Sequence, residues 1–172
     1  LANYSDGMDP IHYYLAAIEA MDFQIGRLLN GLTQEERDNT IILFMGDNGT
    51  PNEVGQSPYA GNAVKGSLYQ GGINVPLFVS GKGVQRTGND YNLLTSTDLF
   101  STIAQLAGGS STEIHDSKSF KELLTINDGQ RAFQYSEMES QNARKWAISK
   151  GDAKLIVRAK GAQEWEDSRT DT

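Results

Sequence analysis

The sequence of 172 residues contains no cysteine, which excludes a disulfide framework and any chemistry that needs a thiolate from this chain. Histidine is almost as scarce: His12 and His115 are the two present, and neither belongs to a recognisable metal-ligand pattern. No apolar run approaches the roughly 20 residues that a membrane-spanning helix needs, so we expect no membrane span. The lack of cysteine leaves the cellular compartment open.

Basic residues are also in deficit, with 15 lysines and arginines against 22 aspartates and glutamates and a net charge of −7. A surface of this sign repels phosphate backbones, so we expect no nucleic-acid partner. The hydrophobic fraction of 38% is ordinary for a globular protein, and the length allows one core with a small appendage. The sequence starts at Leu1 without a signal-like segment, so we expect a processed product or a part of a longer polypeptide.

A short apolar run, Thr40 to Met45, is the most informative stretch of the sequence. Six apolar or β-branched residues are too few for a helix and too continuous for a half-exposed strand. The run therefore predicts a strand that is buried on both faces, as in the parallel sheet of an α/β protein. It ends at Gly46-Asp47-Asn48-Gly49, and loops at the carboxyl ends of strands bind ligands in open α/β sheets.

Asp47 and Asn48 allow two interpretations. Aspartate, asparagine and glycine favour tight turns whatever their function, and the four residues alone favour a turn. A carboxylate beside an amide oxygen also offers two hard ligands, which suit Ca²⁺ or Mg²⁺. One ion can reach both side chains if the chain bends there, because neighbouring side chains of a regular strand point to opposite faces. A metal site therefore requires a bend at the end of the strand.

Helices and a second strand are predicted around this strand. Asp9-Pro10 caps and opens a helix whose apolar residues recur every three or four positions, and we expect Gly31 to close it in a left-handed conformation. Val75 to Ser80 predicts the second strand. Thr97-Asp98 opens a further helix, with Leu99 and Ile103 on one apolar face, that ends at two glycines.

Two connections flank the first strand. Thr33 to Asn39 predicts a short charged connection. Thr50 to Gly72 contains five glycines, two prolines and little periodicity, and loops of this length inside a compact domain are usually functional or disordered. Lys65 lies in this loop, but its surroundings do not fit a phosphate-binding P-loop. On these grounds alone, Lys65 is a solvated charge.

The character of the sequence changes after residue 128. Three short strands of a small antiparallel sheet are predicted at residues 132–136, 145–149 and 154–158. We expect the last dozen residues to fray, with Trp165 as their one large apolar side chain. This pattern predicts two parts, an α/β domain over residues 1–128 and a small antiparallel subdomain over residues 129–172.

Five segments in this order resemble the C-terminal part of the sulfatase family, within the alkaline phosphatase superfamily. The likeness runs from Tyr13 to about Val157. Each segment alone is a weak signal, but five in the right order and spacing form a specific match. The segments are Ala16–Asp22 with Ile25–Leu29, Ile41–Gly49, Lys65–Pro76, Thr97–Ile103 and Lys154–Ile156.

The resemblance implies part of a mixed, mostly parallel sheet flanked by helices, followed by the small antiparallel sheet. It implies that Asp47 and Asn48 complete the coordination of one Ca²⁺ ion, and that Lys65 contacts the sulfate and a formylglycine nucleophile. Asn48 favours calcium-type sulfatases over the zinc phosphatases and phosphodiesterases of the superfamily, which typically have histidine after this aspartate. The implied substrate is a carbohydrate or aryl sulfate ester, and the implied compartment is periplasmic or secreted.

Several features of the family are missing from the sequence. The Cys/Ser-x-Pro-x-Arg motif that supplies the nucleophile does not occur, nor do the first pair of metal-binding aspartates and an upstream histidine; Gln70 replaces the usual glutamate and Ser117 the usual glycine. We therefore expect a C-terminal fragment of a calcium-dependent sulfatase. By itself it should be inactive, bind Ca²⁺ weakly or not at all, and self-associate through an exposed sheet edge. Two alternatives stay open: a phosphate or phosphonate ester hydrolase of the same superfamily, and a non-catalytic binding module.

Overall fold

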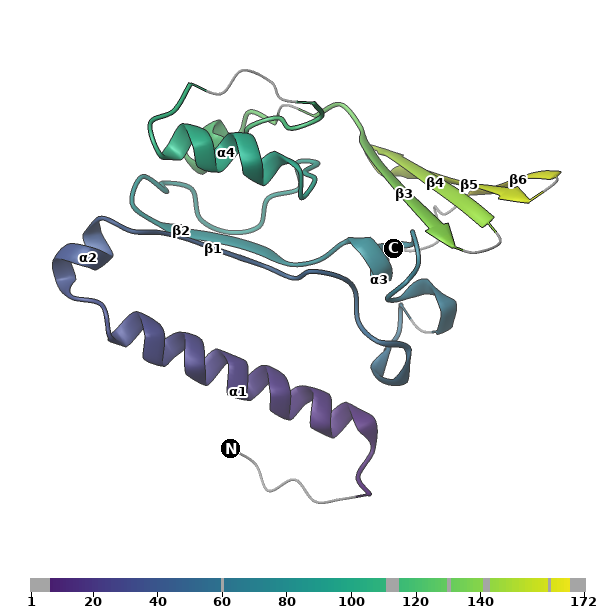
Figure 1. The fold of residues 1–172 in the computed structure, drawn as a ribbon, viewed down its shortest axis with the longest axis horizontal. Coiled ribbons are helices and arrows are strands. Elements are labelled where there is room, and N and C mark those ends of the chain that lie inside the picture. The colour runs from purple at the N-terminus through teal and green to yellow at the C-terminus, as the bar shows by residue number, and fades with distance from the viewer. Residues whose placement is uncertain are drawn as a thin grey trace. The chain divides into compact units, whose positions relative to one another are not determined.

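The computed structural model describes residues 7–59, 61–110, 115–129, 131–140, 143–160 and 162–167. The chain divides into two compact units, Leu1–Lys82 and Gly83–Thr172. Figure 1 shows helices and strands in both units, which confirms the α/β class. Among the described residues, no helix is long and apolar enough to cross a lipid bilayer. The domain boundary that the sequence predicts between residues 128 and 129 stays a prediction.

The first unit begins with α1, Pro10–Asn30. Its start is as predicted, because Asp9 Oδ1 accepts a hydrogen bond from Ile11 N at 3.0 Å and proline occupies the first helical position. Its end is different: Gly31 has a φ of −76°, so the prediction of a left-handed cap is wrong. The Gly31 N–H still donates to carbonyls of the last helical turn, and the chain leaves the helix without a positive φ.

A second helix, α2, spans Gln34–Asp38, so the prediction of a connection without a helix over residues 33–39 is wrong. Thr33 and Glu36 form a capping box, in which Thr33 Oγ1 accepts from Glu36 N at 3.2 Å and Glu36 Oε2 accepts from Thr33 N at 2.7 Å. The hydrogen bonds from Thr33 favour the charged carboxylate and lower the pKa of Glu36. The Thr-x-x-Glu spacing is the sequence signal for this helix.

Strands β1, Ile41–Met45, and β2, Leu77–Gly81, form a two-stranded antiparallel sheet in the first unit (Figure 1). Both lie where the sequence predicts strands. The rings of Phe44 and Phe78, which face each other in the register, have centroids 6.0 Å apart. β1 is half-buried, so the prediction that it is buried on both faces is wrong for the described residues. Its described partner, β2, runs antiparallel to β1. The parallel strands that the sequence predicts beside β1 stay a prediction.

The connection between the two strands is mostly irregular, as the sequence predicts. It contains three short helical segments, η1 (Asn52–Val54), η2 (Gly61–Ala63) and α3 (Gln70–Ile73). Among its described residues, the buried apolar side chains are Val54, Val64 and Leu68. Val64 and Leu68 lie on either side of Lys65 in the sequence, so the backbone that carries Lys65 is flanked by buried side chains.

In the second unit, α4 spans Asp98–Leu106, and the φ of 84° at Gly108 agrees with the predicted glycine stop. Ile103, on the apolar face that the sequence indicates, is 51% exposed. The polar side of α4 is buried, because its polar groups form hydrogen bonds there. For example, the backbone N–H of Ser101 donates to Ser117 Oγ at 3.0 Å. The buried residues of α4 are Asp98, Ser101 and Thr102.

A short turn, η3 (Lys121–Leu124), precedes a four-stranded antiparallel sheet with the strand order β3-β4-β5-β6. The predicted antiparallel sheet is confirmed. A fourth strand at 162–167 pairs with β5, so the expectation that this stretch frays is wrong; residues 168–172 and the side chain of Trp165 lie outside the described part. The strands are β3 (Gln134–Ser140), β4 (Ala143–Lys150), β5 (Ala153–Lys160) and β6 (Ala162–Asp167).

Candidate functional site

The loop that follows β1 carries the two candidate cation ligands. The chain bends at Asp47 and Asn48, at the end of the strand, as a shared ion requires. Asp47 is exposed and Asn48 is partly exposed. The bend removes the strand geometry that would force the two side chains apart. That both point toward one ion stays a prediction.

Three backbone hydrogen bonds join this loop to the segment that contains Lys65. They connect the residues on either side of the Asp-Asn pair to three points along the later segment. Together they fix the position of the Asp-Asn loop from both of its ends. The bonds are Gly46 N to Pro76 O at 3.0 Å, Gly49 N to Gly72 O at 3.0 Å, and Lys65 N to Thr50 O at 2.9 Å.

Gly49 packs directly against the backbone of Gly71 and Gly72. A Cβ atom at Gly49 would lie 2.7 Å from Gly72 Cα and would also clash with Gly71 O. Such a close approach of two backbones requires a residue without a side chain. The glycine after Asn48 is therefore a packing requirement, which the interpretation as a simple turn does not explain.

Lys65 belongs to the same cluster of loops. Its backbone N–H bonds to Thr50, two residues beyond Asn48 in the chain. Buried side chains of Val64 and Leu68 anchor the loop, whereas Lys65 itself is exposed. The structure therefore brings the lysine loop and the Asp-Asn loop together, although the sequence separates them by a long connection.

The donor set fits part of the shell of a hard cation. A carboxylate and an amide oxygen are ligands that Ca²⁺ prefers, but Ca²⁺ takes about six to eight oxygens. The described residues contain no group of three or more histidine, cysteine, aspartate or glutamate side chains that could hold a metal ion. His12 and His115, both exposed, are thus outside any such group in the described part of the chain. These residues offer a partial site.

Ser67, two residues after Lys65, is a neighbour of the site for which the sequence gives no signal. Its Oγ atom is buried and has no hydrogen-bond partner within the described part of the chain. A Cβ on Gly72 would lie 2.6 Å from Ser67 Oγ and 2.7 Å from Val64 O. A serine in a glycine-rich loop is ordinarily solvated, so neither composition nor spacing distinguishes it.

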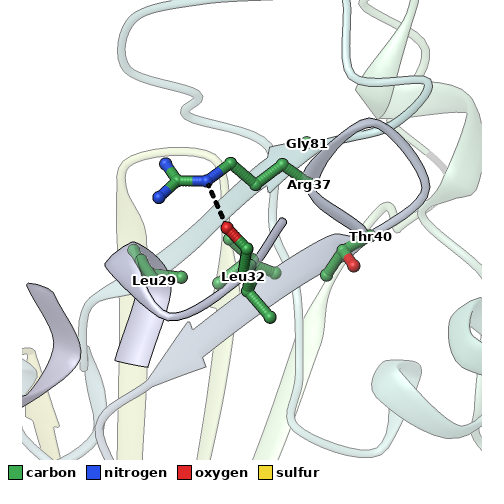
Figure 2. Close-up of a pocket in the computed structure, with 6 residues that line it drawn as sticks. Leu29, Leu32, Arg37, Thr40 and Gly81 are labelled. Carbon is green, nitrogen blue, oxygen red and sulfur yellow. Dashed lines mark hydrogen bonds between the residues drawn. The ribbon is translucent and has the colours of Figure 1, made fainter. Parts of the chain in front are cut away.

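An open pocket lies at the opposite end of β1 from Asp47. Figure 2 shows Arg37 at this pocket, where its Nε donates to Leu32 O at 3.2 Å. The pocket shares no lining residue with the loops of Asp47 and Lys65, so it is not part of the candidate site. Its volume is about 210 Å³, and it is lined by Leu29, Leu32, Arg37, Thr40, Ile42 and Gly81.

Comparisons with known proteins point to sulfatases. The family model described as Sulfatase matches residues 3–110, a range that contains Asp47, Asn48 and Lys65. A sulfatase of Formosa agariphila is 33% identical over 117 residues, covering 59% of this chain and 21% of the relative. An arylsulfatase of Klebsiella aerogenes is 31% identical over 134 residues, covering 55% of this chain and 29% of the relative.

A similar solved structure is that of BT4656 in complex with its substrate D-glucosamine-2-N,6-O-disulfate. It matches with a TM-score of 0.77 and 27% identity, over 92% of this chain and 34% of that chain. The chain thus spans about a fifth to a third of the length of these proteins. The likeness in fold extends over nearly all of this chain, while most of each matched protein lies beyond it.

Proposed function

Because the chain belongs to the sulfatase family, we propose that it forms part of an enzyme that hydrolyses sulfate esters. One observation carries the proposal beyond the family: backbone hydrogen bonds join the Asp47-Asn48 loop to the Lys65 loop within the matched range. A fold alone is compatible with many activities. A carboxylate, an amide and an ammonium group gathered on joined loops can hold a cation and an anionic ester together.

The proposed substrate is a sulfated sugar or an aryl sulfate. Support for a sugar comes from the BT4656 structure, whose substrate is a disulfated glucosamine, and support for an aryl ester comes from the Klebsiella aerogenes arylsulfatase. The first likeness covers 92% of this chain and the second covers 55%. A sulfated sugar is therefore the first substrate class to test.

Lys65 has the chemistry to bind the sulfate group. Its ammonium group is a compact charge with three N–H donors. When a sulfate ester is cleaved, negative charge builds up on the oxygens around the sulfur, and a charge already in position stabilises it. The nucleophile, proposed to be a formylglycine, lies outside this chain, since the sequence has neither cysteine nor a Ser-x-Pro-x-Arg motif.

Asp47 and Asn48 are proposed to supply two oxygen ligands to a Ca²⁺ ion. A bound cation of this kind contributes positive charge that draws electron density from the sulfate oxygens. The part played by this chain is to hold both ligands at a bend, with Gly49 packed on Gly72 to fix the backbone. Because two ligands are far fewer than six to eight, the isolated chain should bind Ca²⁺ weakly or not at all in calorimetry.

Hydrolysis assays on the full-length protein test this proposal. The wild type should release sulfate from an aryl sulfate or a sulfated glucosamine, and a calcium chelator should abolish the reaction. Asp47→Ala should lower kcat/KM by about 10²–10³-fold, the scale of one lost charge-stabilising group. Asp22→Ala, which removes an exposed carboxylate of α1, should have little effect. Turnover of phosphate esters instead of sulfate esters, or full activity of Asp47→Ala, contradicts the proposal.

The 172-residue chain alone should turn over neither sulfate nor phosphate esters, because it lacks the nucleophile and most of the metal shell. Turnover of an aryl sulfate well above the buffer rate by this chain, lost in Asp47→Ala, would mean that the nucleophile lies within it. The same aryl sulfate assay serves both proteins, so the two results are directly comparable.

A further inference from the structure

Gly72 is held between the two loops of the proposed site. On one side, its carbonyl oxygen accepts the N–H of Gly49 at 3.0 Å. On the other side, a Cβ atom would lie 2.6 Å from Ser67 Oγ and 2.7 Å from Val64 O, and would clash with Ser67 O as well. A Cα hydrogen of Gly72 therefore points among three oxygen atoms.

The Ser67 hydroxyl is one of these three oxygens. Its Oγ is buried and makes no conventional hydrogen bond within the described part of the chain. Burial of a hydroxyl without a partner is unfavourable, so its presence beside Gly72 calls for a physical explanation. Because a Cβ on Gly72 would lie 2.6 Å from this oxygen, the Cα hydrogen in that direction points at it and has the geometry for a weak C–H···O contact. That contact is small, but it acts on the residue that receives the hydrogen bond from the Asp-Asn loop.

We propose that Ser67 is a positioning residue of the site, because its hydroxyl holds Gly72 in position. In that position Gly72 O accepts the hydrogen bond from Gly49 N, and this bond holds the Asp47-Asn48 loop beside the lysine loop. Ser67 acts through Gly72 and Gly49 and is assigned no contact with the substrate or the cation. The consequence for cation binding rests on the proposed function. The contact between Ser67 and Gly72 does not.

A purely structural role for Ser67 predicts the opposite sign. If the hydroxyl is a buried polar group and nothing more, Ser67→Ala removes an unfavourable desolvation, and the bond between Gly49 and Gly72 stays as it is or tightens. If the hydroxyl holds Gly72 in position, Ser67→Ala leaves a gap beside Gly72, and the hydrogen bond from Gly49 N to Gly72 O breaks more often. The direction of the change therefore decides between the two roles.

Hydrogen exchange at the Gly49 amide of the full-length protein measures this direction. We expect Ser67→Ala to accelerate exchange about two- to fivefold, the scale of one weak C–H···O contact. Ser67→Thr keeps the hydroxyl and should restore the wild-type rate. Ser80→Ala, an exposed serine of β2, should leave the rate unchanged. Unchanged or slower exchange in Ser67→Ala overturns the proposal.

Calcium titration of the same variants separates this inference from the proposed function. Calorimetry should show a Kd for Ca²⁺ that is about two- to fivefold weaker in Ser67→Ala and normal in Ser67→Thr, at unchanged melting temperature. If Gly49 exchange responds but the wild type neither binds Ca²⁺ nor hydrolyses a sulfate ester, the proposed function is wrong and the seating of Gly72 stands. If the wild type does both and Gly49 exchange does not respond, the positioning role is wrong and the proposed function stands.

Discussion

Arg131 makes a forked contact with the fully buried carboxylate of Asp98, 33 residues earlier in the chain. Arg131 Nε donates to Asp98 Oδ2 at 2.6 Å, and a terminal guanidinium nitrogen donates to Oδ1. The same carboxylate accepts the backbone N–H of Thr95 at 2.9 Å and of Lys118 at 2.8 Å. Asp98 thus ties the start of α4 to two later segments of the second unit, and its buried charge is balanced by the Arg131 guanidinium and two backbone N–H donors.

Arg131→Ala should destabilise the second unit by about 3–5 kcal/mol, because the Asp98 carboxylate would remain buried without its counter-charge. The matched control is Arg144→Ala, which breaks an ion pair with Glu139 whose side chains are 66% and 68% exposed. Exposed pairs contribute about 0–1 kcal/mol, so the control should have a small effect. Urea unfolding of the full-length protein measures both, and equal effects would contradict the role assigned to Arg131.

The Asp98 carboxylate should also make the second unit sensitive to acid. Burial raises the pKa of Asp98, but hydrogen bonds from Arg131, Lys118 and Thr95 outweigh burial and hold the pKa below its ordinary value. Because the pKa is lower in the folded state, the stabilisation is fully present above the unfolded value of about 3.9 and is lost as the pH falls through the folded value. Asp98→Asn should flatten this loss of unfolding free energy below about pH 4. Parallel pH profiles for the wild type and the variant would rule the explanation out.

Substitution by alanine at two glycines of the first unit should change the stability of the fold in opposite directions. A Cβ on Gly26, inside α1, meets nothing within 4 Å, so Gly26→Ala should stabilise the 172-residue chain by about 0.5–1 kcal/mol through helix propensity. Gly49→Ala places a Cβ 2.7 Å from Gly72 Cα and should lower the melting temperature by forcing the two loops apart. A Gly49→Ala variant as stable as the wild type would mean that these loops do not pack as described.

The parts of the fold that local signals specify could be predicted from the sequence. Asp9-Pro10 defines the start of α1, and a continuous apolar run defines β1, because caps and apolar runs act over a few neighbouring residues. The antiparallel partner of β1, the polar strand β6 and the buried polar side of α4 could not be predicted in this way. Each of them depends on residues distant in the sequence.

The candidate site also has a part that could be predicted from the sequence and a part that could not. Asp47, Asn48 and Lys65 belong to motifs that can be recognised along the chain. The hydrogen bonds that join their loops and the burial of the Ser67 hydroxyl form only when the chain folds, so they could not be predicted from the sequence. A serine among glycines has the composition of any surface loop, and three-dimensional contacts alone distinguish it.

The first unit exposes apolar side chains that favour association. In the described part of the chain, α1 has no buried residue, and Leu15 and Leu28 are 50% and 70% exposed. β1 pairs with β2 on one edge, and no described strand covers its other edge. We expect the 172-residue chain on its own to self-associate. The double variant Leu15→Gln/Leu28→Gln should shift it toward monomer in sedimentation experiments, and Phe23→Gln, which removes one exposed apolar side chain of α1 instead of two, should do so less. A compact monomer of the unmodified chain at high concentration would contradict this expectation.

Steady-state kinetics of Lys65→Ala in the full-length protein test most directly whether the lysine loop and the Asp-Asn loop form half of a sulfate-ester hydrolase site. Lys121→Ala, an exposed lysine of the second unit, is the control. The expected result is a rise of about 2–4 kcal/mol in the activation free energy, seen mainly in kcat, with an unchanged melting temperature and a normal rate for Lys121→Ala. An unchanged rate together with an unchanged melting temperature would make Lys65 a solvated surface lysine and would contradict the proposed site.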